Sequence, residues 1–228
     1  MKLIILINNI IKVDTDGEIR WSNDAYLSSG STAAHFIIAQ NQLSWGNFYQ
    51  SKIHINKSSG ELTYSGALKG ASDDISDRTF IFGNKNLTID ATYPTGYRPF
   101  VVRMDNGGNF TWVNSVNFTS TSSNVGLQDF GVDNDGNVGL LMNLNNGGSL
   151  SFDNLSTSSS KNHYVISTIN NSGNWDDSFV IDSETPSGFG TYDSAIMGLD
   201  SDGNFIVTMW MYNVNTQQLN ISGSSYWI

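Results

Sequence analysis

The chain has no cysteine and few basic residues. Without cysteine, its 228 residues contain no disulfide, no thiolate metal ligand and no cysteine nucleophile. Eleven Lys and Arg stand against 21 Asp and Glu, which gives a formal net charge of −10. The sequence also contains no basic run. Binding to a nucleic-acid backbone is therefore disfavoured, as is docking on an anionic membrane surface.

Long apolar runs are missing as well. No stretch approaches the roughly 18–20 apolar residues of a membrane-spanning helix. The N-terminal run Leu3–Ile7 has only five residues and is followed by Asn8 and Asn9. A signal peptide needs an apolar core of about 7–15 residues before a cleavage site of small residues. The β-branched run therefore indicates a buried strand, and we expect no leader and no membrane insertion.

Aromatic residues, by contrast, are plentiful. They make up 12% of the chain, enough to predict a folded domain with a real core rather than disorder. Charged residues make up only 14%, so Asn, Ser, Thr, Gln and Gly must provide the polar surface. This balance is more usual on exported or virion surfaces than inside cells. At this length the chain is expected to form a single domain, residues 1–228.

The segment 100–144 shows the organisation most clearly. It reads FVVRMDNGGNFTWVNSVNF, then a Ser/Thr-rich loop, then LQDFGVDNDGNVGLLMNL. Each half is an apolar run, an Asp/Asn/Gly turn and a second apolar run, which predicts a β-hairpin. Glycine permits the positive φ of a tight turn, and an Asp or Asn side chain accepts hydrogen bonds from turn amides. Two hairpins make too small a sheet to be stable alone, so we expect copies that pack against it.

Such copies are present along the chain. The first hairpin recurs as IIKVDTDGEIRW (10–21), IHINKSSGELTY (53–64), VVRMDNGGNFTW (101–112) and VISTINNSGNW (165–175). Its aromatic residue, Trp21 or Trp112 in the clearest copies, follows the turn and is expected to cover a neighbouring sheet. The second hairpin is clearest as FGVDNDGNVGLLM (130–142) and IMGLDSDGNFIVTMW (196–210), and is degenerate at 35–46 and 80–90.

Four repeat units follow, at about 1–50, 51–97, 98–161 and 162–228. They contain no sustained helical periodicity, so the predicted fold class is all-β. Repeats of this length and content favour a β-propeller of about four blades with four antiparallel strands each, and a β-sandwich is the alternative. Tyr226–Ile228 can complete a sheet begun by Leu3–Ile7 and close the ring. Otherwise the chain supplies an arc of a larger ring.

The pairing of FVVRMDNGGNFTW with GVDNDGNVGLLM resembles the bacterial SBBP β-propeller repeats, which alternate a D-G-W half with a D-GN half. The likeness covers most of residues 97–211 and is weaker before them. Similar repeats occur in secreted and surface proteins and in bacteriophage tail or fibre proteins. The resemblance implies a propeller fold, and it brings no catalytic residues.

The D-x-D-G-N turns are candidate metal sites. Asp133 and Asp135, like Asp200 and Asp202, resemble the start of a calcium loop. A calcium loop of the EF-hand type needs a Glu at its twelfth position, where this chain has Leu144 and Met211. An Asx-type hairpin turn is the favoured interpretation, with weak calcium binding as the alternative. No other cofactor is expected.

Catalytic patterns are equally sparse. The histidines have no second ligand at metal spacing, and neither a G-x-S-x-G nor a P-loop pattern occurs. The Asp pairs at 73–74 and 176–177 would point to opposite faces of a strand, so neither suits a glycosidase. Two pairs of aromatic residues can stack on sugars, although burial between blades is favoured for them. They are Trp45 with Tyr49, and Trp210 with Tyr212.

The leading hypothesis is a non-enzymatic virion component such as a phage tail, spike or capsid-associated protein that contributes to host recognition. Its expected location is the virion or an extracellular surface. Its expected partners are other virion proteins, a host surface glycan or receptor, and further copies of itself. A secreted, lectin-like, glycan-binding propeller is the alternative. A glycoside-cleaving enzyme is the third and less favoured class.

Overall fold

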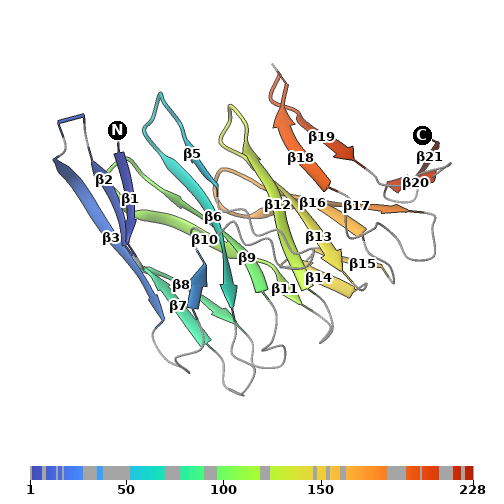
Figure 1. Ribbon diagram of the computed structural model, residues 1–228, viewed down its shortest axis with the longest axis horizontal. Helices are drawn as coiled ribbons and strands as arrows, with labels where there is room; N and C mark the ends of the chain where they lie inside the picture. Colours follow the sequence, from blue (N-terminus) through green and yellow to red (C-terminus); the bar gives the residue numbers. More distant parts are fainter. Residues whose placement is uncertain are drawn as a thin grey trace.

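The computed structural model describes residues 2–6, 9–13, 15–16, 18–27, 35–37, 52–69, 78–89, 97–118, 124–145, 148–152, 155–159, 163–183, 194–200, 202–210, 218–221 and 224–227. In these residues the regular structure consists of antiparallel β-strands joined by turns (Figure 1). The all-β prediction is therefore confirmed. Among the same residues no helix is long and apolar enough to cross a membrane.

The N-terminal sheet has the strand order β1-β2-β3-β7-β8. The apolar run at the N-terminus forms its first strand, as predicted, and the burial predicted for its side chains lies outside the described residues. Because β3 pairs with β7, this sheet joins strands of the first two repeat units. Its strands are β1 (Lys2–Leu6), β2 (Asn9–Val13), β3 (Ile19–Leu27), β7 (Arg78–Phe82) and β8 (Lys85–Ile89).

The second sheet has the order β10-β9-β6-β4, and β5 also pairs with β6. The pairing of β6 with β9 joins the second repeat unit to the third over eight residue pairs, from Leu62–Met104 to Lys69–Tyr97. The strands are β4 (His35–Ile37), β5 (Ile53–Ile55), β6 (Leu62–Lys69), β9 (Tyr97–Met104) and β10 (Phe110–Ser115).

A third large sheet occupies the C-terminal half, with the order β12-β13-β16-β17-β20-β21. The pairing of β13 with β16 joins the third repeat unit to the fourth. Its strands are β12 (Asn124–Val132), β13 (Val138–Asn145), β16 (His163–Ile169), β17 (Trp175–Ser183), β20 (Gln218–Ile221) and β21 (Ser224–Trp227).

Two smaller sheets complete the described structure. One is the sheet β11-β14-β15, made by β11 (Asn117–Phe118), β14 (Gly148–Phe152) and β15 (Leu155–Ser159). The other is the hairpin of β18 (Ser194–Leu199) and β19 (Phe205–Trp210). In the described residues the sheets therefore have five, five, three, six and two strands. Their arrangement as four blades about one axis stays a prediction.

The two ends of the chain do not share a sheet. Among the described strands, β1 pairs with β2 and β21 pairs with β20. The N- and C-termini lie on opposite sides of the molecule (Figure 1). The sheet expected between the two terminal apolar segments, which would have closed a ring, is therefore not formed by these strands.

The predicted hairpin turns are confirmed. The turn glycines Gly60, Gly108, Gly136, Gly173 and Gly203 all have positive φ, between 75° and 87°. In four of these turns the glycine N–H donates to the carbonyl oxygen of the Asp or Asn three residues earlier, at 2.9–3.2 Å. The predicted turn glycine Gly17 lies outside the described residues.

The core is divided into clusters that follow the sheets. One face of the second sheet packs its apolar side chains, among them Phe100, Val102 and Phe110, against Phe80 and Phe82 of β7. The Phe82 ring centroid lies 5.4 Å from that of Phe100 and 5.7 Å from that of Phe110, spacings typical of favourable aromatic pairs. A second cluster lies between the second and third sheets, and a third lies beneath the β18–β19 hairpin.

Candidate functional site

The face of the second sheet that points away from the phenylalanine cluster is polar. Because strand side chains alternate, the inward positions of Leu62, Tyr64 and Val102 place their neighbours on the opposite face. The register sets four residues side by side across the sheet, and Ser65 follows two positions after Thr63 on the same face. We call the polar layer the set of His54, Thr63, Arg103 and Trp112 in that row, together with Lys52, Asn114 and Asp129.

Arg103 is the centre of the polar layer and is 3% exposed. Its Nε donates to Oγ1 of Thr63 at 3.2 Å, and its Nη2 donates to the carbonyl oxygen of Gly136. Nη1 donates to the side-chain oxygen of Asn171, and the guanidinium carbon lies 5.1 Å from the ring centroid of Trp112. One side chain thus joins β6 to two turns, 133–137 and 170–174. Burial lowers the pKa of the Arg103 guanidinium, and the nearby carboxylates of Glu61 and Asp133 partly oppose this.

Trp112 and Asn114 fix the same sheet to the turn 170–174. Trp112 Nε1 donates to the carbonyl oxygen of Asn171 at 3.2 Å, and Asn114 Nδ2 donates to that of Gly173 at 2.6 Å. The Asn171 N–H donates to Oδ1 of Asn137 at 3.1 Å, which links this turn to the turn 133–137. The aromatic residue of this repeat therefore covers the neighbouring sheet, as predicted for Trp112. The side chain of Trp21 lies outside the described residues.

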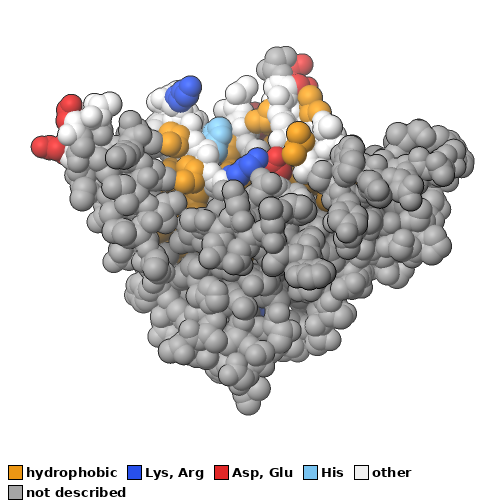
Figure 2. Space-filling model, in the orientation of Figure 1, with side chains coloured by type: hydrophobic (Ala, Val, Ile, Leu, Met, Phe, Trp, Pro, Cys, Tyr) orange, Lys and Arg blue, Asp and Glu red, His pale blue; other side chains and the backbone are white. Residues whose placement is uncertain are grey.

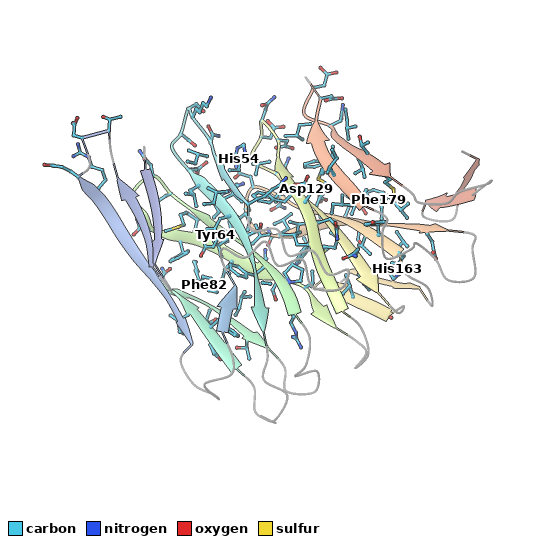
Figure 3. The ribbon with its side chains drawn as sticks, in the orientation of Figure 1. His54, Tyr64, Phe82, Asp129, His163 and Phe179 are labelled. Atoms are coloured by element: carbon cyan, nitrogen blue, oxygen red, sulfur yellow. The ribbon has the colours of Figure 1, made fainter. Side chains whose placement is uncertain are left out.

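Asp129 forms the second charged junction and is 3% exposed. Its Oδ1 accepts hydrogen bonds from Lys52 Nζ and from the N–H of Phe130. Its Oδ2 accepts one from the N–H of Met197 at 3.0 Å. In Figure 3 Asp129 lies between the β5–β6 hairpin and the β18–β19 hairpin, and in Figure 2 basic and acidic atoms meet in the hollow between them. This carboxylate therefore ties β12 to β18 and to the residue preceding β5.

His54 lies on β5 and borders the same hollow (Figure 3). Its pKa is lowered from the usual histidine value by partial burial and, secondarily, by the positive charge of Arg103. Its imidazole is consequently neutral near pH 7, with one nitrogen able to accept a hydrogen bond. Lys52, two residues earlier and on the same face, is 40% exposed. The hollow therefore presents one cation and one neutral imidazole to solvent.

The candidate calcium residues Asp133 and Asp135 belong to a turn in which the Asp133 carboxylate accepts hydrogen bonds from donors of the same turn. Asp133 Oδ1 accepts hydrogen bonds from the N–H groups of Asp135 and Asn137, at 2.9 and 2.7 Å. Its Oδ2 accepts one from Asn137 Nδ2 at 2.8 Å. Asp135 is exposed and contributes its N–H to this turn. A carboxylate that already accepts three hydrogen bonds is a poor member of a calcium ligand set, because the cation would have to replace these donors.

The turns of Asp200 and Asp105 repeat this geometry. Asp200 accepts from the N–H groups of Asp202 and Asn204 and from Asn204 Nδ2, at 2.8–2.9 Å. Asp105 accepts from the N–H and Nδ2 of Asn109. In each case the Asn side-chain donor is the main cause of a lowered aspartate pKa. In the part of the chain with described side chains, no three His, Asp or Glu residues are grouped to hold a metal ion. These geometries support the Asx-turn interpretation.

The aromatic candidates for sugar stacking are mostly not placed. Trp45, Tyr49 and Tyr212 lie outside the described residues, and only the backbone of Trp210 is described, at the end of β19 opposite Ser194. Their role in sugar binding stays a prediction.

Sequence reasoning did not identify Lys52, Arg103, Asp129 or Asn171 as functional residues. The available signal was a charged residue inside an apolar strand, as in FVVRM and LQDFGV. Such residues are costly to bury without partners, so each one predicts a specific partner elsewhere in the fold.

Comparison with known proteins gives no relative. No family model matches the chain, and neither a curated protein nor a solved structure matches it significantly.

Proposed function

We propose that this chain is a non-enzymatic structural and recognition protein of a virion or an extracellular surface, of the kind found in phage tails, spikes or capsid-associated components. The proposal includes the SBBP-type repeat and the propeller-like arrangement that the sequence favours. One observation carries it. The buried charged residues of the polar layer bind groups of the neighbouring repeat: Arg103 donates to Asn171, and Asp129 accepts from the N–H of Met197.

Catalysis by an acid or a base needs a side chain that is free to exchange a proton with a substrate. Asp129 accepts three hydrogen bonds, and Arg103 donates to three different residues. These groups hold hairpins together, which is the task of a scaffold. A scaffold with a polar interior layer of this kind keeps its surface loops in fixed positions, and such loops are where binding functions usually reside.

The hairpin turns support a recognition role. The β5–β6, β12–β13 and β18–β19 turns project at one edge of the molecule (Figure 1). Each is braced by its own Asx hydrogen bonds, which turn N–H groups donate to Oδ1 of Asn56, Asp133 or Asp200. A row of rigid turns loses little conformational entropy on binding. It presents the amide, hydroxyl and carboxylate groups that match the hydroxyl groups of a surface glycan.

Fractionation of the source culture tests the location. An antibody raised against the purified chain is used to follow it through cell, culture-fluid and sedimenting-particle fractions. We expect the chain in the particle fraction. A chain confined to the culture fluid would favour the secreted, glycan-binding alternative, and a chain confined to the cell interior would contradict both.

A panel of polysaccharides tests the absence of enzymatic activity. We expect no release of reducing sugar, with or without measurable binding. Turnover that is lost when a single Asp is replaced would contradict the proposal and establish the glycoside-cleaving alternative.

A further inference from the structure

The β18–β19 hairpin has one covered face and one open face. On the covered side, Ala195 and Met197 are buried against Leu141, Tyr164 and Ile181 of the third sheet. On the open side, Ile196 is 61% exposed and Ile206 is 49% exposed, and Gly198 and Thr208 are exposed beside them. Figure 2 shows hydrophobic side chains on this projecting hairpin. The described residues of the open face, Ile196, Gly198, Ile206 and Thr208, are all uncharged.

A related face occurs on the β12–β13 hairpin, and there it is covered. The turns DNDGN (133–137) and DSDGN (200–204) align, so Gly131 of β12 corresponds to Gly198 of β18. Gly131 pairs with Gly139, and together they form a notch without side chains. Phe205 of the next hairpin fills this notch, because a Cβ built on Gly139 would lie 2.6 Å from its ring and one on Gly131 would lie 3.6 Å from it.

Gly198 provides one half of the corresponding notch on the outer hairpin, where Ile206 takes the place of Gly139, and the space above Gly198 is empty. A Cβ built there meets no atom within 4 Å. Ile206 lies directly opposite Gly198, and Ile196 lies two residues along the same face. The open face thus carries both a notch and two apolar knobs. A two-fold axis places the same face of two copies against each other, so that an apolar knob of one copy can enter the notch of the other.

We propose that the open face of β18–β19, formed by Ile196, Gly198, Ile206 and Thr208, is the docking surface for the same face of a second copy of this chain. The contact resembles the packing of β18–β19 on β12–β13, where an apolar side chain also covers glycine. An isoleucine of one copy lies over Gly198 of the other, as Phe205 lies over Gly131 and Gly139. A two-fold axis that runs across the strands keeps the acidic turns around Asp200 at opposite ends.

The size of the face sets the expected affinity. Four short side chains per copy give an interface well below the ~800 Å² per partner of a stable complex, so the dimer is expected to be weak and reversible. On a virion or other multivalent surface, such a weak contact gains strength because the copies are held close together.

Sedimentation velocity of the full chain between about 10 μM and 1 mM tests the proposal. We expect a reversible monomer–dimer equilibrium. Ile196→Lys places a charge in the face and is expected to weaken the dimer at least ~10-fold. Gly198→Leu fills the notch, and because the site is open in the monomer the variant is expected to fold normally and to dimerise as poorly as Ile196→Lys.

Ile53→Lys is the matched control, since it makes the same change at an exposed isoleucine on β5, away from this face. It is expected to dimerise as the unmodified chain does. Circular dichroism checks that all variants are folded. A chain that remains monomeric at 1 mM would overturn the proposal. So would a dimer that neither Ile196→Lys nor Gly198→Leu weakens.

Discussion

The indole ring of Trp112 occupies the space that a side chain on Gly173 would need. A Cβ built on Gly173 lies 2.5 Å from Cγ of Trp112, and the φ of Gly173 is +86°. The two residues belong to successive repeat units. The glycine therefore serves two purposes, because it allows the turn of its own repeat and makes room for the aromatic residue of the preceding one.

Replacement of this glycine should be costly. In Gly173→Ala the left-handed backbone becomes strained and the new methyl group collides with Trp112, so the free energy of unfolding should fall by ~2–4 kcal/mol. Gly198→Ala is the control, because a Cβ there meets no atom within 4 Å, and it should change stability by no more than about 0.5 kcal/mol. Urea denaturation measures both. Equal losses in the two variants would contradict this packing.

The notch under Phe205 gives a second comparison within one hairpin. Gly139→Ala places a methyl group 2.6 Å from the Phe205 ring and should cost ~1–3 kcal/mol, whereas Gly131→Ala meets the ring at an ordinary 3.6 Å and should be nearly neutral. Adding Phe205→Leu should make the Gly139→Ala change less damaging, which a double-mutant cycle detects. Independent, additive losses would show that the ring does not lie in the notch.

The Lys52–Asp129 pair is expected to contribute to stability although Lys52 is 40% exposed. Lys52→Met leaves the Asp129 carboxylate buried without its cation and should cost ~1–3 kcal/mol, a value reduced by the access of water to the lysine. Asp129→Leu leaves the N–H of Met197 without an acceptor and should cost at least as much. In thermal or urea unfolding, the double variant should lose clearly less than the sum of the two. Additive losses would contradict a direct pair.

Because of His54, we expect the folded chain to lose stability in mildly acidic solution. Its pKa is lower in the folded chain than the value of 6.5 for a free side chain, because of partial burial and then the charge of Arg103. The unfolded chain therefore binds more protons between the two pKa values. The stability contributed by neutral His54 should be fully present above about pH 7 and be lost as the pH falls below 6.5. His54→Gln should flatten this part of the stability profile, and an unchanged slope would contradict the assignment.

Asp105 and Asp200 are expected to affect the stability of the fold at lower pH than His54 does. Their pKa values are lowered from 3.8, chiefly by hydrogen bonds from the side chains of Asn109 and Asn204. The stability that these turns provide should therefore be present above about pH 4 and be lost as the pH falls below 3.8. Asn204→Ala should raise the pKa of Asp200 in an NMR titration and leave that of Asp105 unchanged. A shift at both turns, or at neither, would contradict the local origin of the effect.

The local parts of this fold could be predicted from the sequence. The hairpin turns at Gly108, Gly136, Gly173 and Gly203 follow from chemistry within five residues, in which glycine takes a positive φ and an Asp or Asn accepts the turn amides. The position of Trp112 over a neighbouring sheet follows from the same repeat, because a large aromatic residue on a small sheet must find cover.

The polar layer could not be predicted, because its partners are distant in the chain. Lys52 and Asp129 are 77 residues apart, and Arg103 and Asn171 are 68 apart. Neither pair belongs to a common motif. The strand order adds to the difficulty, since β6 pairs with β9 and β13 with β16, so each sheet combines successive repeat units. Asp133 and Asp200, which have a calcium-like spacing in the sequence, accept hydrogen bonds from amides of their own hairpin turns.

The central claim is that the buried charges of the polar layer join successive repeats, and amide hydrogen exchange in Arg103→Met tests it most directly. Lys57→Met, which removes an exposed lysine from the turn after β5, is the control. We predict that the amides of turns 133–137 and 170–174 lose protection together, by ~10-fold or more, in Arg103→Met and keep it in Lys57→Met. Loss of protection confined to β9 and its direct strand neighbours would contradict the claim.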